Sequence, residues 1–163
     1  MLILLAGCMG PPDPPADAQQ DTDAALPGLT LSTWIEPRQG RVQLHALVVN
    51  DHTDGYWYRV NCHHPWNITL EAPDGRSIEF RRVPMEPGCA PQQDILQPKQ
   101  YLDSMWSWDA RDHDPEQGTS VPVEDGAYTW TAAFAVRDSP VELAVTYHIR
   151  VVDGVLGNVT LAG

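Results

Sequence analysis

Two stretches in which large apolar residues alternate with polar ones constrain the fold of this chain more than any other feature. They lie within residues 96–109 and 124–136, on either side of a polar loop at residues 110–123. Side chains of a β-strand point to opposite faces with a period of two, so each stretch predicts a strand with one apolar face. Two such strands flanking a loop are typical of the centre of a β-sandwich. The residues on the predicted faces are Leu102, Ser104, Trp106 and Trp108 in the first strand, and Tyr128, Trp130, Ala132, Phe134 and Val136 in the second.

Shorter runs of the same kind flank this pair. Between two of them, Asp74-Gly75 supplies the positive φ that a tight hairpin turn needs. The sequence shows no amphipathic helix and no internal repeat. We therefore expect one all-β domain over residues 28–163, an immunoglobulin-like antiparallel β-sandwich of about seven to eight strands. The further strands are expected at residues 29–35, 41–50, 56–62, 66–71, 76–83 and 141–152, and a last short run at residues 155–161 is a candidate for a sheet edge.

The charge of the chain narrows the classes of partner. Its formal net charge is −12, from 22 acidic against 10 basic residues. Nucleic acids and anionic membrane surfaces are bound by clustered Lys and Arg, which this composition does not favour. We therefore expect no nucleic-acid partner, while basic protein partners stay open.

The N-terminus predicts where the protein resides. Leu5-Ala6-Gly7-Cys8 resembles the bacterial lipobox, in which a signal peptidase cuts before a cysteine that carries a diacylglyceryl group. Residues 1–8 are then expected to be the end of a signal peptide. Because the apolar run is short and no positive charge precedes it, we expect that this signal peptide is truncated and starts further upstream. The mature protein is expected outside the cytoplasm, in the cell envelope, held at the membrane by its lipid anchor alone. The alternative is a cysteine that follows an apolar start by chance.

Residues 9–27 are predicted to be a disordered tether between lipid and domain. The segment contains Pro-Pro-Asp-Pro-Pro and four aspartates without a basic residue. It has little apolar surface whose burial would offset the entropy lost on ordering.

Several motifs between Arg41 and Val136 resemble the BsuPI-like family, the intracellular proteinase inhibitors. The resemblance implies an immunoglobulin-like sandwich and inhibition of a proteinase, with a serine protease as the expected partner. Two departures are Pro98-Lys-Gln, where the family has Pro-Gly-Glu, and a longer, more aromatic segment at residues 54–66. The matching pieces are the turn at residues 50–54, Cys62, Asp74-Gly75 followed by Ile78, Cys89, Leu96-Gln-Pro98, Trp108-Asp109 and Asp125-Gly-Ala-Tyr128.

Cys62 and Cys89 are the only cysteines left once Cys8 is lipidated. An even pair in an extracytoplasmic domain predicts a disulfide. The alternative is a metal site around Cys62-His63-His64, completed by Cys89, His52 or His113. Adjacent residues of a strand point to opposite faces, so Cys62 and His63 do not naturally converge on one ion. We therefore predict a disulfide and no metal.

Two surfaces are predicted to contact a protein. An inhibitor needs a stiff exposed loop that loses little entropy on binding, and the prolines of the loop after residue 83 favour it for this role. The predicted inhibitory residues are Pro84, Met85, Glu86, Pro87 and Gly88. An aromatic contact rim is predicted from Tyr56, Trp57, Tyr58 and Trp66, with burial in the core as the alternative.

No pattern of a catalytic site is found. The serines lie outside any nucleophile-elbow context, and the acidic pairs Asp112/Asp114 and Glu124/Asp125 fall in predicted loops, where solvation explains them. We therefore expect a monomeric lipoprotein that binds protein, is not an enzyme and needs no cofactor. The alternative function is an envelope scaffold, assembly or adhesion module without inhibitory activity.

Overall fold

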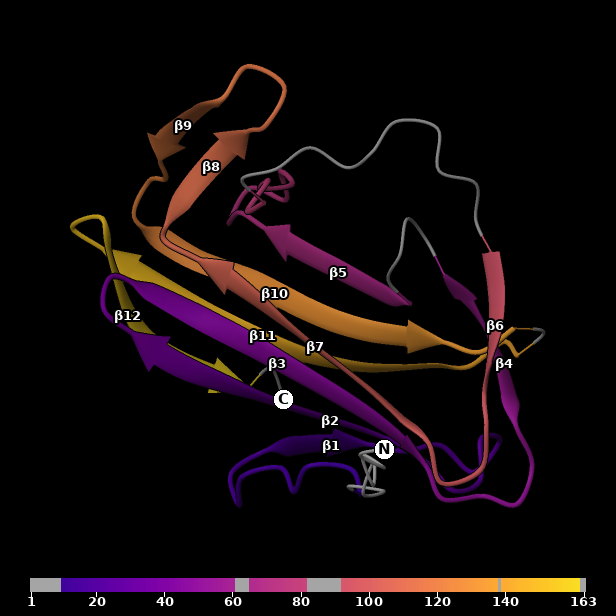
Figure 1. The fold of residues 1–163 in the computed structure, drawn as a ribbon. Helices are drawn as coiled ribbons and strands as arrows, with labels where there is room; N and C mark the ends of the chain where they lie inside the picture. The colour runs from indigo at the N-terminus through magenta and orange to yellow at the C-terminus, as the bar shows by residue number, and fades with distance from the viewer. Residues whose placement is uncertain (1–9, 61–64, 82–91, 138, 162–163) are drawn as a thin grey trace, which may run out of the picture.

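The computed structural model of the chain describes residues 10–60, 65–81, 92–137 and 139–161. The regular secondary structure of these residues consists of β-strands alone, and all pairings between strands are antiparallel (Figure 1). The all-β class predicted from the sequence is confirmed. The described residues form twelve strands, more than the predicted seven to eight, because several short strands pair in places where loops were expected.

The first sheet has the strand order β1-β2-β3-β7. β2 and β3 form a hairpin whose two-residue turn ends at Gly40, with φ at 69°, where a side chain would be strained. β3 pairs on its other side with β7 in one continuous register. The bounds are Gln19–Asp21 for β1, Leu29–Arg38 for β2, Arg41–Asn50 for β3 and Tyr101–Trp108 for β7.

The second sheet has the order β12-β11-β10-β5. β10 lies between β5 and β11 and pairs with both over most of its length. Asp153 and Gly154 both have positive φ, as a tight two-residue hairpin turn between β11 and β12 requires. The bounds are Trp66–Glu71 for β5, Gly126–Ala135 for β10, Glu142–Val152 for β11 and Val155–Leu161 for β12.

Two short ribbons complete the fold. β4 (Tyr56–Val60) pairs with β6 (Gln92–Leu96), and β8 (Arg111–Asp114) pairs with β9 (Thr119–Pro122). The second ribbon corrects the prediction of a loop at residues 110–123. The prediction of a strand at residues 76–83 is wrong for residues 76–81, the part that the structure describes. These residues join β5 only through a bridge from Glu71 to Ser77 and a hydrogen bond from Ile78 N to Leu70 O.

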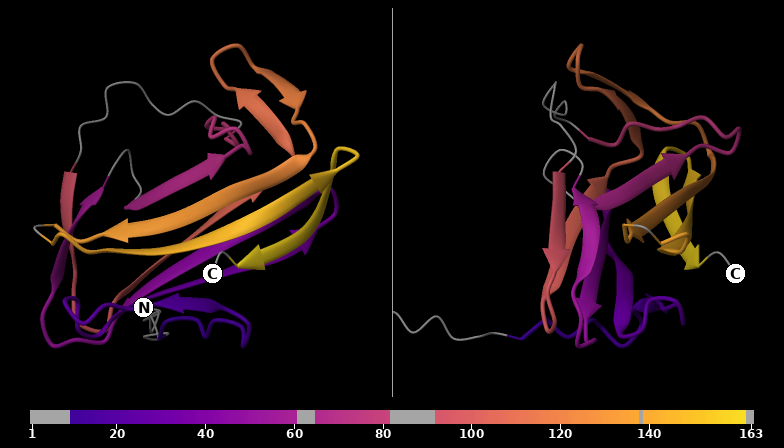
Figure 2. Two further views of the ribbon diagram at one scale, coloured as in Figure 1. Left: turned by 180° about the vertical axis from the view of Figure 1, so that it is seen from behind. Right: turned by 90° about the vertical axis from the view of Figure 1, so that its right-hand side faces the viewer.

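The two four-stranded sheets enclose one core, and their layers are seen edge-on in the right-hand view of Figure 2. The inner faces predicted for β7 and β10 are confirmed, with Trp108, Tyr128, Trp130 and Phe134 buried. Aromatic rings cross from one sheet to the other. Trp66 of β5 meets Trp106 of β7 edge to face at 5.9 Å between centroids, and Trp108 of β7 meets Tyr128 of β10 at 5.1 Å.

The first strand corrects the predicted tether. β1 pairs with β2, from Gln19 opposite Thr33 to Asp21 opposite Leu31. Asp21 Oδ2 also accepts a hydrogen bond from Ala144 N of the other sheet at 2.8 Å, and Leu26 is buried. Backbone pairing at a sheet edge thus stabilises the polar residues of β1, and burial of Leu26 adds to it. The domain therefore begins at about Gln19, before the predicted residue 28.

A buried polar contact joins the sheets near the middle of β2. The Tyr147 hydroxyl donates to Thr33 O at 3.0 Å and lies 2.9 Å from Thr33 Oγ1. Both residues are buried, so the loss of either partner leaves a desolvated oxygen unsatisfied.

Replacement of Tyr147 by Phe tests this contact. We expect Tyr147→Phe to lower the free energy of unfolding by about 1–3 kcal/mol, because the buried Thr33 Oγ1 loses its partner and Thr33 O loses one hydrogen bond. Chemical denaturation measures the change. Tyr101→Phe is the matched control: the Tyr101 hydroxyl makes no hydrogen bond within the described residues, so its removal should cost less than about 0.5 kcal/mol. Equal effects of the two substitutions would contradict a structural role of the contact.

Candidate functional site

The structure divides the predicted aromatic rim into core and surface residues. Tyr58 is 4% exposed and Trp66 2% exposed, so both belong to the core and the rim is wrong for them. Tyr56 is half-buried, and its hydroxyl donates to Pro27 O at 2.6 Å. Trp57 is 50% exposed. The cause is the alternation of β4, which turns Tyr56 and Tyr58 towards the core and Trp57 away from it.

Three side chains of the β4–β6 ribbon and one that follows β10 lie around Trp57. Residues directly opposite one another in an antiparallel pair share a face, and here Trp57 is opposite Ile95 while Arg59 is opposite Gln93. Arg137, just after β10, donates from its backbone N to Trp57 O at 2.7 Å and from Nη1 to Gln93 Oε1. We call these five residues the ribbon face: Trp57, Arg59, Gln93, Ile95 and Arg137.

Asn50, which is fully buried, fixes the ribbon relative to the first sheet. Its side-chain Nδ2 donates to Asp54 O at 2.8 Å, just before β4, and to Leu96 O at 2.9 Å, at the end of β6. Its Oδ1 accepts from His52 N at 2.9 Å. One side chain thus ties both strands of the ribbon to the end of β3, and the ribbon face has a fixed orientation.

A polar hollow adjoins the ribbon face. Its volume is about 660 Å³, and the side chains of Arg59, Gln93 and Arg137 line it. Among the described residues of its lining, Glu142 is the one carboxylate. Arg59 is exposed and forms no ion pair with any other residue that the structure describes. The described part of its lining therefore holds two guanidinium groups and one carboxylate, on a chain whose net charge is −12.

The chemistry of this surface is that of binding. Trp, Tyr and Arg are enriched among the residues that contribute most to the affinity of protein interfaces. An exposed indole beside two guanidinium groups provides a large apolar contact and several hydrogen-bond donors. It suits a partner with an apolar side chain near a carboxylate.

Other predicted site residues fall outside the described part of the chain. These are the lipidation site Cys8, the disulfide pair Cys62 and Cys89, and the inhibitory residues Pro84, Met85, Glu86, Pro87 and Gly88. Within the described residues, no helix has the length and apolarity to cross a membrane.

The described candidates for a metal site do not converge. His52 Nδ1 lies 3.6 Å from Asp54 Oδ2 in the turn before β4, whereas His113 Nε2 lies 3.1 Å from Asp109 Oδ1 on the β8–β9 side. Among the residues in the described ranges, no group of three or more His, Cys, Asp or Glu side chains is placed to hold an ion.

Sequence reasoning missed four of the five residues of the ribbon face. Arg59 could have been predicted from the sequence, since it follows Trp57 by two residues and therefore lies on the same face of the strand. Gln93 and Ile95 could not have been predicted, because the sequence did not indicate a strand at residues 92–96. Arg137 lies 80 positions from Trp57 in the sequence, and only the pairing of strands brings the two together.

The chain thus forms an all-β sandwich domain whose ribbon face exposes a tryptophan beside arginine side chains. Comparison of the sequence with known protein families and with curated proteins finds no match.

The buried Tyr58 under the ribbon provides a test that depends on pH. Burial, and next the negative charge of Asp94, raise the pKa of Tyr58 from 10 to about 12. The unfolded chain releases this proton near pH 10, so the contribution of Tyr58 to stability is complete below pH 10 and is lost as the pH rises towards 12. We expect Tyr58→Phe to flatten this part of the decline in stability, measured by chemical denaturation at a series of pH values.

A spectroscopic control accompanies this measurement. The tyrosinate absorbance of the native protein minus that of Tyr58→Phe should show a midpoint near pH 12. Asp94→Asn should move the midpoint down, because it removes the charge that disfavours the phenolate. A native midpoint at pH 10 would contradict the buried position of Tyr58.

Proposed function

We propose that this protein is a lipid-anchored protein of the cell envelope whose β-sandwich binds another protein through the ribbon face. The half-exposed Trp57, on a ribbon that Asn50 holds in place, is the observation that carries the proposal. An indole at the surface of an ordered strand loses little conformational freedom on binding, so most of its contact with a partner is retained as affinity.

The strand order supports an immunoglobulin-like assignment. In such sandwiches, strands A, B and E are neighbours in one sheet and strands C, F and G in the other. The orders β2-β3-β7 and β5-β10-β11 correspond to these two sets. The Tyr128 hydroxyl donates to Glu124 O at 2.7 Å, four residues upstream, as in the tyrosine corner of these domains. Both features favour the resemblance to BsuPI-like domains, and we infer proteinase inhibition as the concrete form of binding.

The inhibitory loop would be a second contact with the same partner. Pro84 to Gly88 is a proline-rich segment, which suits the entry of a stiff loop into a protease cleft. A serine protease held at the ribbon face and blocked by this loop is the partner we propose. An envelope scaffold would use the ribbon face without the loop.

The lipid anchor would keep the domain near the membrane. Gln19 is the first of the described residues held in a sheet, so ten residues separate it from Cys8, and the eleven Cα–Cα steps between the two span at most about 40 Å. Each buried methylene of the lipid contributes about 0.8 kcal/mol, so two or more acyl chains hold the protein without a spanning segment.

Substitution of Cys8 tests the anchor. In its bacterial host, the wild-type protein should partition into detergent-extracted membranes, and Cys8→Ser should move it to the aqueous fraction, because the thiol that accepts the lipid is lost. Cys62→Ser and Cys89→Ser are the matched controls and should leave the partition unchanged. A Cys8→Ser protein that stays in the membrane fraction would refute lipid anchoring at this residue.

Substitution of the ribbon face tests the binding function. The domain from Gly10 onwards is immobilised and exposed to the extracytoplasmic proteins of its own organism, and the captured protein is purified. We expect Trp57→Ala to weaken its binding by about 30-fold, the loss typical of an interface residue that contributes strongly to affinity. Val121→Ala is the control, since Val121 is 60% exposed on β9, away from the ribbon. Equal affinity of the two variants would remove the ribbon face from the interface.

The same complex separates an inhibitor from a scaffold. If the captured protein is a serine protease, its residual activity is measured against the wild-type domain and against a variant with Met85 and Glu86 both replaced by Ala. Loss of inhibition with binding retained identifies the loop as the inhibitory element. A captured protein without protease activity assigns the domain to the scaffold class.

A further inference from the structure

β7 is the edge strand of the first sheet that lacks the usual protection against pairing with another chain. Edge strands are normally short, irregular, covered or charged. In the described residues, β1 has three residues, β12 has a register shift, and Ser77 bridges the end of β5. β7 has eight residues in continuous register, no Lys or Pro, and one charged residue, Asp103.

The backbone of β7 has one side to which no described residue is bonded. Every second residue of an edge strand directs its N–H and C=O away from its partner strand. Within the described part of the chain, β7 pairs only with β3, and no other backbone bond reaches residues 101–108. The side chains along this edge are large and partly exposed, with Met105 51% exposed and Trp106 half-buried.

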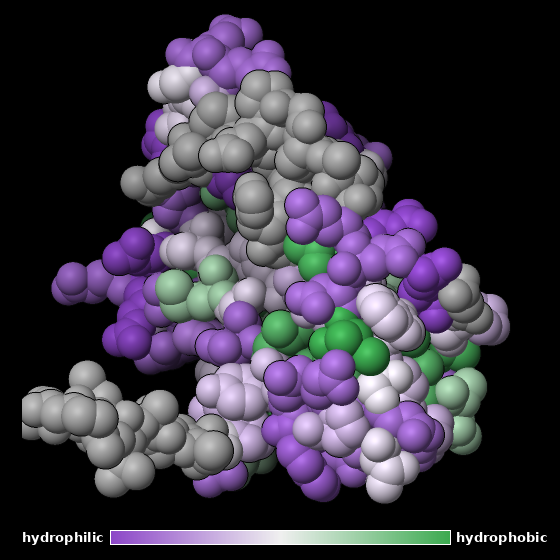
Figure 3. Space-filling view, turned by 45° about the vertical axis from the view of Figure 1, so that its right-hand side comes forward, coloured by the Kyte–Doolittle hydropathy of each residue, from purple (hydrophilic) through white to green (hydrophobic). Residues whose placement is uncertain are grey.

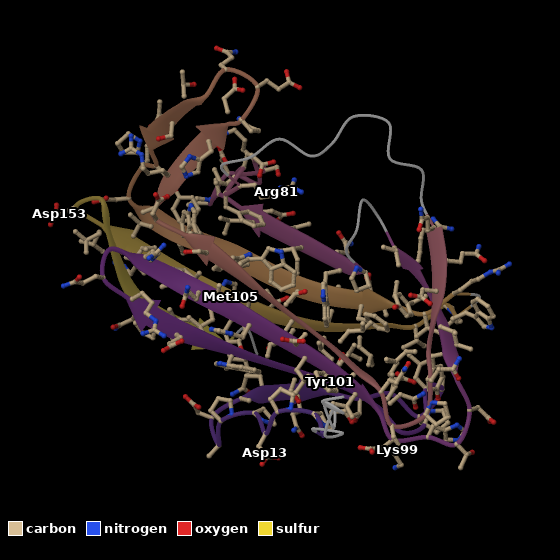
Figure 4. All side chains as sticks on the ribbon, in the orientation of Figure 1. Asp13, Arg81, Lys99, Tyr101, Met105 and Asp153 are labelled. Carbon is tan, nitrogen blue, oxygen red and sulfur yellow. The ribbon has the colours of Figure 1, made fainter. Side chains whose placement is uncertain are left out.

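A hollow of about 440 Å³ opens beside the second half of the strand. Trp106, Phe80 and Met105 give it apolar walls, and two arginines, Arg41 and Arg81, line it together with the carboxylate of Asp109. Figure 4 shows Met105 on β7 and Arg81 beyond it, at the end of the segment that follows β5. Arg81 is engaged by Glu79 through two contacts of 2.9 and 3.0 Å, whereas Arg41 is exposed and forms no ion pair with the residues that the structure describes.

A second hollow, of about 640 Å³, lies at the start of the strand. Tyr101 and Leu102 of β7 line it together with Ile95 of β6. From the side where β4 and β6 lie, the surface is mostly hydrophilic around a compact apolar patch (Figure 3). A free strand edge with a hollow near each end is the arrangement by which proteins bind extended peptides: the backbone gives affinity and the hollows select side chains.

We propose that β7 binds an extended segment of another protein, which adds to the first sheet as a further strand. The segment places a large apolar side chain beside Trp106 and an acidic side chain against Arg41. Charge selects this occupant over a second copy of the chain. Copies that each carry a net charge of −12 repel one another, whereas the exposed guanidinium of Arg41, which pairs with no described carboxylate, attracts an acidic side chain. This site shares no residue with the ribbon face except the neighbouring Ile95.

Selection from random peptides tests the chemistry of the segment. A phage-displayed library of random eight-residue peptides is selected on the domain from Gly10 onwards, and in parallel on its Arg41→Glu variant. We expect the wild-type domain to enrich peptides in which Asp or Glu stands near an aromatic or large aliphatic residue. The variant should enrich Lys or Arg at the acidic position. Absence of enrichment, or the same charge preference for both proteins, would overturn the proposal.

Substitutions on β7 and amide exchange test the mode of binding. For the best enriched peptide, Met105→Lys should weaken binding at least about tenfold, because a lysine on an edge strand opposes strand addition. Trp57→Ala should leave the affinity unchanged, which separates this site from the ribbon face. The peptide should slow hydrogen exchange at alternate amides of β7, since these become bonded to the added strand.

Three results would contradict strand addition at β7. One is unchanged exchange at the β7 amides with the peptide bound. Another is equal affinity of Met105→Lys and the wild-type domain. The third is a domain that is dimeric without peptide and becomes monomeric on Met105→Lys, since the occupant of the edge is then a second copy.

Discussion

The burial of aromatic side chains between two sheets is the constraint on which the rest of this structure depends. Trp66, Trp108 and Trp130 are almost completely buried, and they come from strands of both sheets. Because side chains alternate with a period of two, a slip of one residue in any of these strands would turn its aromatic residues out to solvent. The register of β3 with β7 and of β5 with β10 is therefore fixed by the core, and the positions of the surface residues follow from it.

The two candidate surfaces, the ribbon face and the edge of β7, lie at the borders of this core. Trp106 faces inward but lies on an edge strand, so its ring is covered on one side by Trp66 and open to the hollow on the other. Trp57 is out of phase with the core, between the inward-facing Tyr56 and Tyr58. The periodicity that buries most of the aromatic residues thus exposes these two in fixed positions, where an indole offers a large contact area.

Sequence reasoning identified the elements whose side chains carry a burial signal and missed those held by backbone bonds. The inner face of β10 could be predicted because Tyr128, Trp130 and Phe134 alternate without interruption. β1 and the β8–β9 ribbon are polar, and their stability comes from ladder bonds that any sequence can make, so they were assigned to a tether and a loop. For Tyr58 and Trp66 the sequence indicated a contact role but not whether the side chain is buried or exposed, because aromatic residues suit both a core and an interface.

Asn50 is hydrogen-bonded to the segments that carry both surfaces. Its backbone N donates to Gln100 O at 3.0 Å, and its backbone O accepts from Lys99 N at 2.8 Å. The turn into β7 is therefore held by the same residue whose side chain holds β4 and β6. The free edge of β7 and the ribbon face therefore keep one relative geometry in the unbound domain. A partner that touched both would lose little free energy in ordering them, and the two contacts would add with a small entropic penalty. Substitution of Asn50 would disturb both surfaces at once although it belongs to neither.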